Sequence, residues 1–214
     1  MRRFRCDCCK GLVVLESDQC VGCGCRLAFV PDLFQVVCWD DPQRRREQRS
    51  LGPARIRYRL CGNYAEHNIC NWTVAADDPN PLCVACRSTR VIPDLSVAEN
   101  LARWYRLESA KRRLMVGLMG LGLPLHSRSV EADDGLSFQF LAETQGPTSQ
   151  TVLTGHNNGL ITVNIAEADD AERERRRVEL HEPYRTLLGH LRHEVGHYYW
   201  DRLIRDSTRL ARFR

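Results

Sequence analysis

The sequence predicts an α+β fold in two parts. Residues 1–95 form a cysteine-rich, metal-dependent region, and residues 96–214 continue with a long helix and a partial second domain that contains a small antiparallel sheet. Three observations predict this. All eleven cysteines lie before position 87, helical periodicity begins near position 96, and two segments of two-residue periodicity precede a final helical segment. The length of 214 residues also exceeds that of a typical single domain.

The composition, with 43% hydrophobic and 27% charged residues, is that of a soluble globular protein. The net charge of +4 comes from basic clusters interleaved with acids, which argues against nucleic-acid binding. The longest apolar stretch, residues 114–125, falls short of the ~20 residues that span a bilayer, so we expect no membrane association. The basic start runs into cysteines instead of an apolar signal segment, and we therefore expect a cytoplasmic protein.

The first four predicted metal ligands form two C-x-x-C pairs: Cys6, Cys9, Cys20 and Cys23. Two residues between thiolates let one tight turn present both sulfurs to a tetrahedral zinc. Paired units at this spacing are typical of a zinc ribbon of the rubredoxin-like kind. Cys8 is an alternative to Cys9, and the spacing favours Cys9. Disulfide-linked or free thiols are the competing interpretation.

A second set of four cysteines follows: Cys61, Cys70, Cys83 and Cys86. Only its second half is a C-x-x-C pair, but four thiols equal the number that a closed structural zinc site needs. We therefore predict a second structural zinc. His67 is a reserve ligand, although a surface position is the stronger interpretation. Cys25 and Cys38 are left over, and we expect them to be small buried hydrophobic residues.

The second part opens with a helix. The segment Ser96-Val97-Ala98-Glu99 has the spacing of a capping box, and apolar residues recur at helical intervals from Leu101 to Leu121. We expect the helix to end between Gly120 and Pro124, to join the two parts and to pack on the second.

Strand-like periodicity follows the helix. Apolar residues alternate with polar ones at positions 136–140 and again at 161–165, after the turn signal Asn157-Asn158-Gly159, which indicates a small antiparallel sheet. The charged residues 167–179 indicate an exposed helix. The last helix is expected to begin near Pro183 and to run towards Ile204.

This last helix carries His193-Glu194-Val195-Gly196-His197, an H-E-x-x-H motif. Histidines at i and i+4 share one helix face and can bind one zinc, while the adjacent glutamate reaches a zinc-bound water as acid and base. The motif predicts peptide hydrolysis with His193 and His197 as metal ligands and Glu194 as the catalytic residue. Residues 161–165 could add a substrate strand to their edge.

Other polar residues near the motif have two interpretations each. His190 is expected to support the metal site or the core. Tyr184, Tyr198 and Tyr199 are either oxyanion donors or, as aromatic residues at these spacings more often are, core residues. The role of Asp201 stays ambiguous between the site and the surface.

A third protein ligand for the catalytic zinc is not evident. The extended motif would place a glycine and a third histidine where this chain has Trp200 and Leu203, and Asp201 and Asp206 are the only acids after His197. A catalytic zinc takes three protein ligands and a water. We therefore expect the third ligand beyond Arg214, and little or no turnover by these 214 residues alone.

Several motifs distributed over the whole chain resemble one bacterial family: the N-terminal F-x-C-x-x-C ribbon, Cys70-Asn71-Trp72, Cys83-x-x-Cys86-Arg87, Ile92-Pro93-Asp94-Leu95, Ala110-Lys111-Arg112-Arg113-Leu114, Thr154-Gly155-His156, Ala166-Glu167-Ala168-Asp169-Asp170, and Tyr184-Arg185-Thr186-Leu187-Leu188-Gly189-His190 through Trp200. The family is that of zinc-binding metallopeptidases with an N-terminal zinc-ribbon domain. The resemblance implies a zincin-like second domain, with His193 and His197 as zinc ligands, Glu194 as the catalytic residue and the first four cysteines as ribbon ligands. It also implies a further segment, rich in acidic, aromatic and histidine residues, that supplies the third ligand.

The sequence supports two hypotheses about function, one of an enzyme and one of a binding module. The leading one is a zinc metallopeptidase acting on a peptide or protein substrate, with one or two structural zinc ions and one catalytic zinc. The alternative is a non-catalytic zinc-ribbon module that binds protein or nucleic acid. A steep salt dependence of affinity for DNA or RNA would favour the alternative.

Overall fold

The computed structural model describes residues 3–39, 49–52, 55–125, 135–143, 152–179, 181 and 185–213. The chain forms two compact units, Met1–Arg87 and Ser88–Arg214. The division precedes the expected boundary after residue 95 because the strand Thr89–Val91 pairs with a strand of the second unit.

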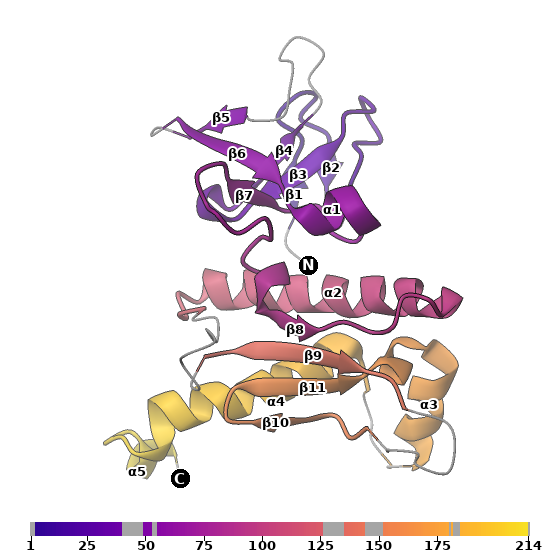
Figure 1. Cartoon of the computed structure of the whole chain (residues 1–214). Helices are drawn as coiled ribbons and strands as arrows, with labels where there is room; N and C mark the ends of the chain where they lie inside the picture. The colour runs from indigo at the N-terminus through magenta and orange to yellow at the C-terminus, as the bar shows by residue number, and fades with distance from the viewer. Residues whose placement is uncertain are drawn as a thin grey trace. The chain divides into compact units, whose positions relative to one another are not determined.

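The first unit is built from short antiparallel strands (Figure 1). Two of its sheets are hairpins, β1 (Phe4–Arg5) with β2 (Leu12–Val13) and β3 (Leu27–Val30) with β4 (Gln35–Cys38). The third joins β5 (Arg49–Leu51), β6 (Ile56–Leu60) and β7 (Thr73–Ala75). The short helices are η1 (Pro31–Leu33), α1 (Gly62–His67) and η2 (Cys86–Ser88).

A small aromatic core holds the first unit together. Phe29 and Trp72 are both fully buried, and their ring centroids lie 4.8 Å apart. The backbone N–H of Phe29 donates to the carbonyl of Asn71 over 2.8 Å, which ties β3 to the segment between α1 and β7.

The second unit contains one mixed sheet with the strand order β10-β11-β9-β8. The strands are β8 (Thr89–Val91), β9 (Ser137–Leu141), β10 (Gly155–Asn157) and β11 (Leu160–Asn164). The helices are α2 (Ala98–Gly120), η3 (Ile165–Ala168), α3 (Asp170–Glu179), α4 (Leu187–Trp200) and α5 (Leu210–Phe213), with the π-helical turn η4 (Asp201–Arg205) after α4.

The expected antiparallel sheet is wrong for two of the three strand pairs. β10 and β11 are antiparallel around the predicted turn, where Asn158 and Gly159 have positive φ angles of 45° and 86°. However, β9 is parallel to β11, with Phe138 opposite Ile161, and β8 is parallel to β9. Two-residue periodicity identifies a strand and its buried face, but it carries no information about the direction of the neighbouring strand.

The helix α2 matches the predicted helix in length but begins differently. Val97, not Ser96, is the N-terminal cap, so the expected capping box does not form. Instead, the Asp94 carboxylate accepts a hydrogen bond from the backbone N–H of Ser96 over 2.9 Å. The helix ends at Gly120, within the predicted range, and contacts α4 and η3.

An ion pair is buried between α2 and the sheet. The Lys111 ammonium lies 2.9 Å from the Glu108 carboxylate, and both side chains are fully buried. The Trp104 indole N–H donates to the same carboxylate over 3.3 Å, and Lys111 also lies 5.4 Å from the ring centroid of Phe138. A charged pair in this position is not visible in the apolar pattern, which predicts only the hydrophobic contacts of α2.

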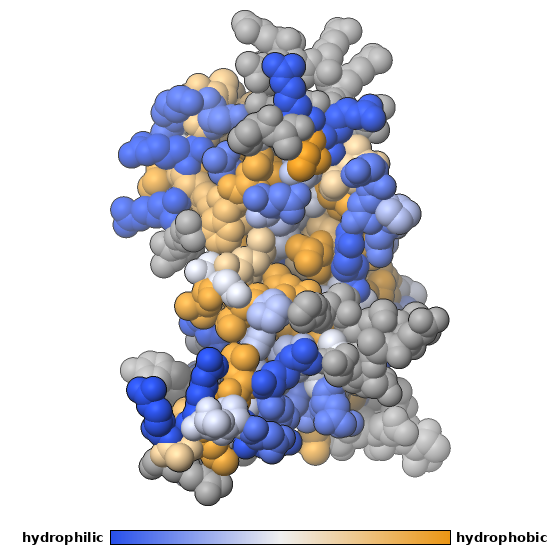
Figure 2. Space-filling model, turned by 90° about the vertical axis from the view of Figure 1, so that its left-hand side faces the viewer, coloured by the Kyte–Doolittle hydropathy of each residue, from blue (hydrophilic) through white to orange (hydrophobic). Residues whose placement is uncertain are grey.

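None of the described helices is both long enough and apolar enough to cross a membrane. On the face that Figure 2 shows, hydrophilic side chains are interspersed with hydrophobic ones.

Candidate metal centres and active site

The structure brings together the first four predicted ligands. The sulfurs of Cys6, Cys9, Cys20 and Cys23 all lie within 4.8 Å of one another. Two turns present them: the backbone N–H of Lys10 donates to the carbonyl of Cys6 over 2.9 Å, and that of Gly24 donates to the carbonyl of Cys20 over 2.8 Å. Gly24 has a φ of +70°, a conformation that favours glycine. Cys8 is exposed and does not belong to this group.

The chemistry of this first tetrad suits zinc. Cys6 and Cys20 are buried, whereas Cys9 and Cys23 are exposed to solvent. A hydrogen bond from the backbone N–H of Cys23 lowers the pKa of the Cys20 thiol to about 7. The thiolate is the metal-binding form, so the turn prepares at least one sulfur for a cation.

The second tetrad is closed to solvent. The sulfurs of Cys61, Cys70, Cys83 and Cys86 lie within 4.8 Å of one another, and the four side chains are at most 3% exposed. Backbone N–H groups donate to the sulfurs of Cys61, Cys70 and Cys83 over 3.3–3.4 Å. Hydrogen bonding with Cys70 is the largest contribution lowering the pKa of the Cys61 thiol. Four converging sulfurs with N–H donors are typical of a structural zinc site.

The remaining cysteines and His67 lie outside both tetrads. Cys25 and Cys38 are buried, as expected, but they form a disulfide with each other, so their interpretation as unlinked hydrophobic residues is wrong. His67 lies 3.7 Å from the Glu66 carboxylate and stays partly exposed, away from the sulfurs of the second tetrad.

The helix α4 presents the H-E-x-x-H motif. Its first turn is capped by Thr186, whose hydroxyl accepts a hydrogen bond from the N–H of Gly189 over 3.0 Å. The helix therefore begins at Leu187, four residues later than the expected start near Pro183, which itself lies outside the described residues. The apolar face of the helix, which includes Leu191 and Val195, is buried, whereas His193 and His197 are exposed on the other face.

The two motif histidines converge. Their Nε2 atoms lie 3.1 Å apart, and their ring centroids are 4.8 Å apart with the rings nearly perpendicular. His156 of β10 stacks against His197 at 6.1 Å between centroids. The His156 Nε2 accepts a hydrogen bond from the N–H of Gly159 over 2.8 Å, and burial lowers the pKa of this imidazole. His156 belongs to the Thr154-Gly155-His156 motif, but spacing along the chain does not predict its approach to His197, because it lies on a different element of the fold.

A third metal-binding side chain does not join this pair in the part of the chain that the structure describes. Asp201 forms an ion pair with Arg205 over 2.6 Å instead. A catalytic zinc takes three protein ligands, and His193 and His197 are two candidates for that role.

The tyrosines near the motif are core residues. Tyr198 and Tyr199 are 3% and 8% exposed, and the Tyr199 hydroxyl donates to the carbonyl of Pro124 over 2.8 Å. Tyr184 lies outside the described residues.

A cleft of about 760 Å³ opens beside the motif. His193 and Glu194 line it from α4, and the residues 152–154 that precede β10 line it from the sheet. Other lining residues come from the end of β9, η3, α3 and the start of α4, and they include Glu143, Glu167, Arg176, Arg185 and His190. The cleft therefore places Glu194 and one motif histidine among several charged side chains, opposite the segment that precedes β10.

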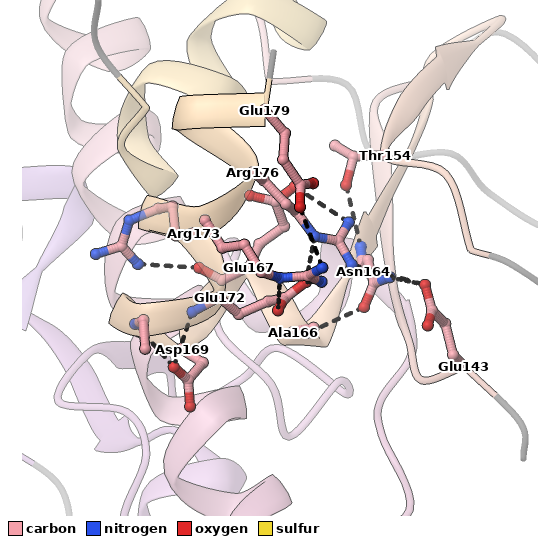
Figure 3. A network of polar contacts seen from close by, with 12 residues as sticks. Glu143, Thr154, Asn164, Ala166, Glu167, Asp169, Glu172, Arg173, Arg176 and Glu179 are labelled. Atoms are coloured by element: carbon pink, nitrogen blue, oxygen red, sulfur yellow. Dashed lines mark hydrogen bonds and ion pairs between the residues drawn. The ribbon is translucent and has the colours of Figure 1, made fainter. Parts of the chain in front are cut away.

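A polar network fixes the wall of the cleft (Figure 3). The buried Asn164 donates from its side-chain amide to Glu143 over 2.8 Å, and its backbone N–H donates to the Thr154 hydroxyl over 3.2 Å. Arg176 of α3 donates to Glu172 over 2.7 Å and lies 3.7 Å from Glu143. Hydrogen bonds from Arg175 and then Arg176 lower the pKa of Glu172 to about 2, so this carboxylate stays charged.

One acid of the predicted exposed helix is buried. The described residues 170–179 form α3 with no buried side chain, as predicted, but Glu167 lies in η3 and is only 1% exposed. Its carboxylate accepts a hydrogen bond from Arg185 over 2.6 Å and lies 3.4 Å from Nδ1 of His190. Burial of this acid depends on partners supplied by a later segment, which is why the local charge pattern does not predict it.

The chain is similar to known proteins along its whole length. Residues 100–214 match the family described as "Putative zinc-binding metallo-peptidase", and residues 3–97 match a zinc-ribbon domain. One relative from Mycobacterium bovis and two from Mycobacterium tuberculosis, all described as uncharacterized proteins, are 40% identical over 215 residues that include the whole chain. The chain spans 58% of the length of these relatives. No solved structure matches it. The chain therefore belongs to the family described as putative zinc-binding metallo-peptidases, with a zinc ribbon before the peptidase region.

Proposed function

We propose that the protein is a zinc-dependent metallopeptidase with a zincin-like second domain. The observation that carries this proposal is the convergence of His193 and His197, 3.1 Å apart at Nε2, beside a glutamate that lines a cleft. Two nitrogens on one exposed helix face suit a zinc ion, which prefers imidazole ligands.

The residues of the motif have separate roles. His193 and His197 would hold the zinc through Nε2. The metal, when bound, lowers the pKa of water towards ~7 and polarises a carbonyl group. Glu194 takes a proton from the attacking water and passes it to the leaving amine, so it acts as base and then as acid. This role requires that Glu194 face the cleft without being a ligand.

The substrate is seated along β10 in this proposal. The expectation that residues 161–165 offer a free edge is wrong, because β11 lies between β10 and β9. β10 is the outermost described strand on the side of the motif, and residues 152–154 before it line the cleft. An extended peptide can therefore add to the edge at β10 and place its scissile bond towards Glu194.

The two cysteine tetrads hold structural zinc in this proposal. Each has four sulfurs, which leaves no open coordination position for chemistry. Nine of the cysteines are outside the Cys25–Cys38 bond, and eight of these form the two tetrads, which favours a compartment such as the cytoplasm where thiols stay available for zinc.

The test compares turnover of a mixed peptide library by the wild-type chain, Glu194→Gln and His193→Ala, with zinc present or chelated. His67→Ala is the matched histidine control, because His67 lies outside the proposed sites. We expect slow zinc-dependent hydrolysis by the wild type and the control, and none by the other two variants.

Because the chain spans 58% of its relatives, the same assay is run on a full-length mycobacterial relative, in which we expect faster turnover. Turnover by Glu194→Gln equal to that of the wild type would contradict the role of Glu194. The absence of zinc-dependent hydrolysis from both proteins would contradict the proposed function.

A further inference from the structure

Two cysteines outside the tetrads lie close to the first of them. Cys25 and Cys38 form a disulfide at one end of the β3–β4 hairpin, where their Cα atoms are 5.7 Å apart. The two strands are already paired from Leu27 opposite Cys38 to Val30 opposite Gln35. The bond spans only 13 residues, so it constrains the chain less than a bond between distant segments would. Its position beside the tetrad is the more informative feature.

Cys25 belongs to the turn that carries the second pair of zinc ligands. Its carbonyl accepts a hydrogen bond from the backbone N–H of Cys20 over 2.8 Å, which closes the turn around Cys23. The N–H of Gly24 closes the same turn a second time by donating to the carbonyl of Cys20 over 2.8 Å. A displacement of Cys25 therefore displaces the backbone that positions Cys20 and Cys23.

Cys38 is tied to the turn that carries the first pair of ligands. Its backbone N–H donates to the Asp7 carboxylate over 2.6 Å. Asp7 lies in that turn, between Cys6 and Cys9 in the chain. The disulfide therefore connects the second turn, through Cys38 and this hydrogen bond, to the first.

The first tetrad is a zinc site on which such a link has an effect. Cys9 and Cys23 are exposed to solvent, so zinc held there can exchange with the surroundings, whereas all four cysteines of the second tetrad are buried. Zinc leaves a four-sulfur site when some of the sulfurs move away from the others. Each of the two turns carries two sulfurs, and separation of the turns is a motion of this kind. A link between the turns opposes it.

A purely structural disulfide is the competing interpretation. The rings of Phe4 and Phe29 lie 5.8 Å apart and tie β1 to β3, so the strands of the first unit are also held together without the bond. A structural role predicts that opening the bond lowers the stability of the whole unit. The hydrogen bonds of Cys25 and Cys38 to the two turns predict instead that opening the bond acts on the first tetrad.

We propose that Cys25 and Cys38 form a redox-controlled clamp on the first zinc site. With the bond closed, the two turns are held together and the site retains its zinc. With the bond open, the turns separate more readily and the zinc exchanges. The clamp goes beyond the proposed peptidase function and does not depend on it.

The redox partners are a low-molecular-weight disulfide as oxidant and a dithiol as reductant. Cys25 is the first to react because it is the more exposed of the two, at 8% against 2% for Cys38. Its thiolate attacks one sulfur of the oxidant, forms a mixed disulfide and releases one thiol. The Cys38 thiolate then attacks the Cys25 sulfur and releases the second thiol. Two electrons pass from the cysteines to the oxidant, and the two cysteine protons end on the released thiols. A dithiol reverses both steps and is itself oxidised to a disulfide.

The test measures zinc release from the whole chain in its two redox forms. The chain carries His193→Ala, so that zinc at the motif histidines does not contribute. The zinc-loaded protein is treated with oxidised glutathione to close the bond or with dithiothreitol to open it, and gel filtration then removes the reagent. Mass spectrometry of peptides verifies the state of the bond, and a chromophoric chelator reports zinc release.

We expect the fast phase of zinc release, from the exposed first tetrad, to be roughly tenfold faster with the bond open, because a disulfide restricts the freedom of the chain that it closes. The slow phase, from the buried second tetrad, should not change. The variant with Cys25→Ala and Cys38→Ala should release zinc as the open form does and should not respond to oxidised glutathione.

Two further variants test the path of the link. Asp7→Ala removes the acceptor of the Cys38 N–H, so the fast phase should become similar in the two redox forms although the bond still closes. Cys8→Ser is the matched control, because Cys8 is an exposed thiol next to Asp7 that belongs neither to a tetrad nor to the pair. It should keep the full difference between the two forms.

The outcomes separate the clamp from a structural bond. Equal fast phases in the open and closed forms overturn the inference, and this comparison needs no substitution in the first unit. Equal acceleration of both phases in the open form shows a general loss of stability and also overturns it. A difference that Asp7→Ala leaves unchanged overturns the assigned link through Cys38. None of these results bears on the proposed peptidase function, which peptide turnover tests.

Discussion

The Nε2 atoms of His193 and His197 lie 3.1 Å apart, although the two residues are separated by one turn of α4. The helix places both side chains on one exposed face, and the nearly perpendicular rings bring their nitrogens to a common point. Two ring nitrogens that converge in this way, on side chains open to solvent, suit the binding of one metal ion.

With zinc added in excess, His193→Ala should bind about one equivalent of zinc less than the wild type and keep its fold. The side chain is exposed, so its loss creates no cavity. Zinc content by mass spectrometry and the thermal midpoint by circular dichroism measure the two effects, with His67→Ala as the control. Unchanged zinc content in His193→Ala would speak against a metal at this pair.

The two cysteine tetrads should release zinc at different rates. In the first tetrad Cys9 and Cys23 are exposed to solvent, whereas all four cysteines of the second tetrad are buried. A chelator therefore reaches the first tetrad directly. Added EDTA should therefore remove the zinc of the two tetrads in two phases, the slower of which accompanies loss of structure in the first unit. Cys83→Ser should remove the slow phase of zinc release, and Cys8→Ser should change neither phase. A single phase in the wild type would contradict the assignment.

Lys111→Met should destabilise the protein by about 3–5 kcal/mol, because it leaves the Glu108 carboxylate buried without its partner. The double variant Glu108→Leu with Lys111→Met should recover most of that loss. Urea unfolding measures the free energies, with Glu174→Gln as the exposed control, for which we expect a change within about 0.5 kcal/mol. Equal losses in the single and double variants would show that the pair does not act as a unit.

The stability of the first unit should fall at high pH because of Tyr58. Burial and, next, the hydrogen bond to Asp32 raise the pKa of its hydroxyl to about 12, above the value of 10 for an unperturbed tyrosine. A raised pKa means that the neutral form is favoured in the folded state. The contribution of the neutral Tyr58 hydroxyl to the free energy of unfolding is therefore complete below pH 10 and is lost as the pH rises towards 12. Tyr58→Phe should lose less stability over this pH range. Urea unfolding at successive pH values measures the free energy of unfolding of both proteins. An identical dependence on pH for both would contradict the role of Tyr58.

The local patterns of the sequence predicted most residues of the candidate sites. The spacing of cysteines is sufficient to select Cys9 over Cys8 in a tetrad, because two intervening residues set the width of the turn. The motif histidines could be placed on one helix face for the same reason, since the period of the helix fixes which residues are neighbours. In both cases the relevant geometry spans fewer than about five residues.

Properties that depend on distant partners were decided only by the tertiary structure. Spacing and periodicity predicted the two cysteine tetrads, the length of α2 and the face of α4 that carries His193, Glu194 and His197. The fold decided the parallel pairing of β9 with β11, the burial of Glu167 against Arg185 and His190, and the approach of His156 to His197. The physical reason is that strand direction, burial of charge and the walls of a cleft are set by contacts between segments far apart in the chain, whereas periodicity and spacing describe only what lies within one segment.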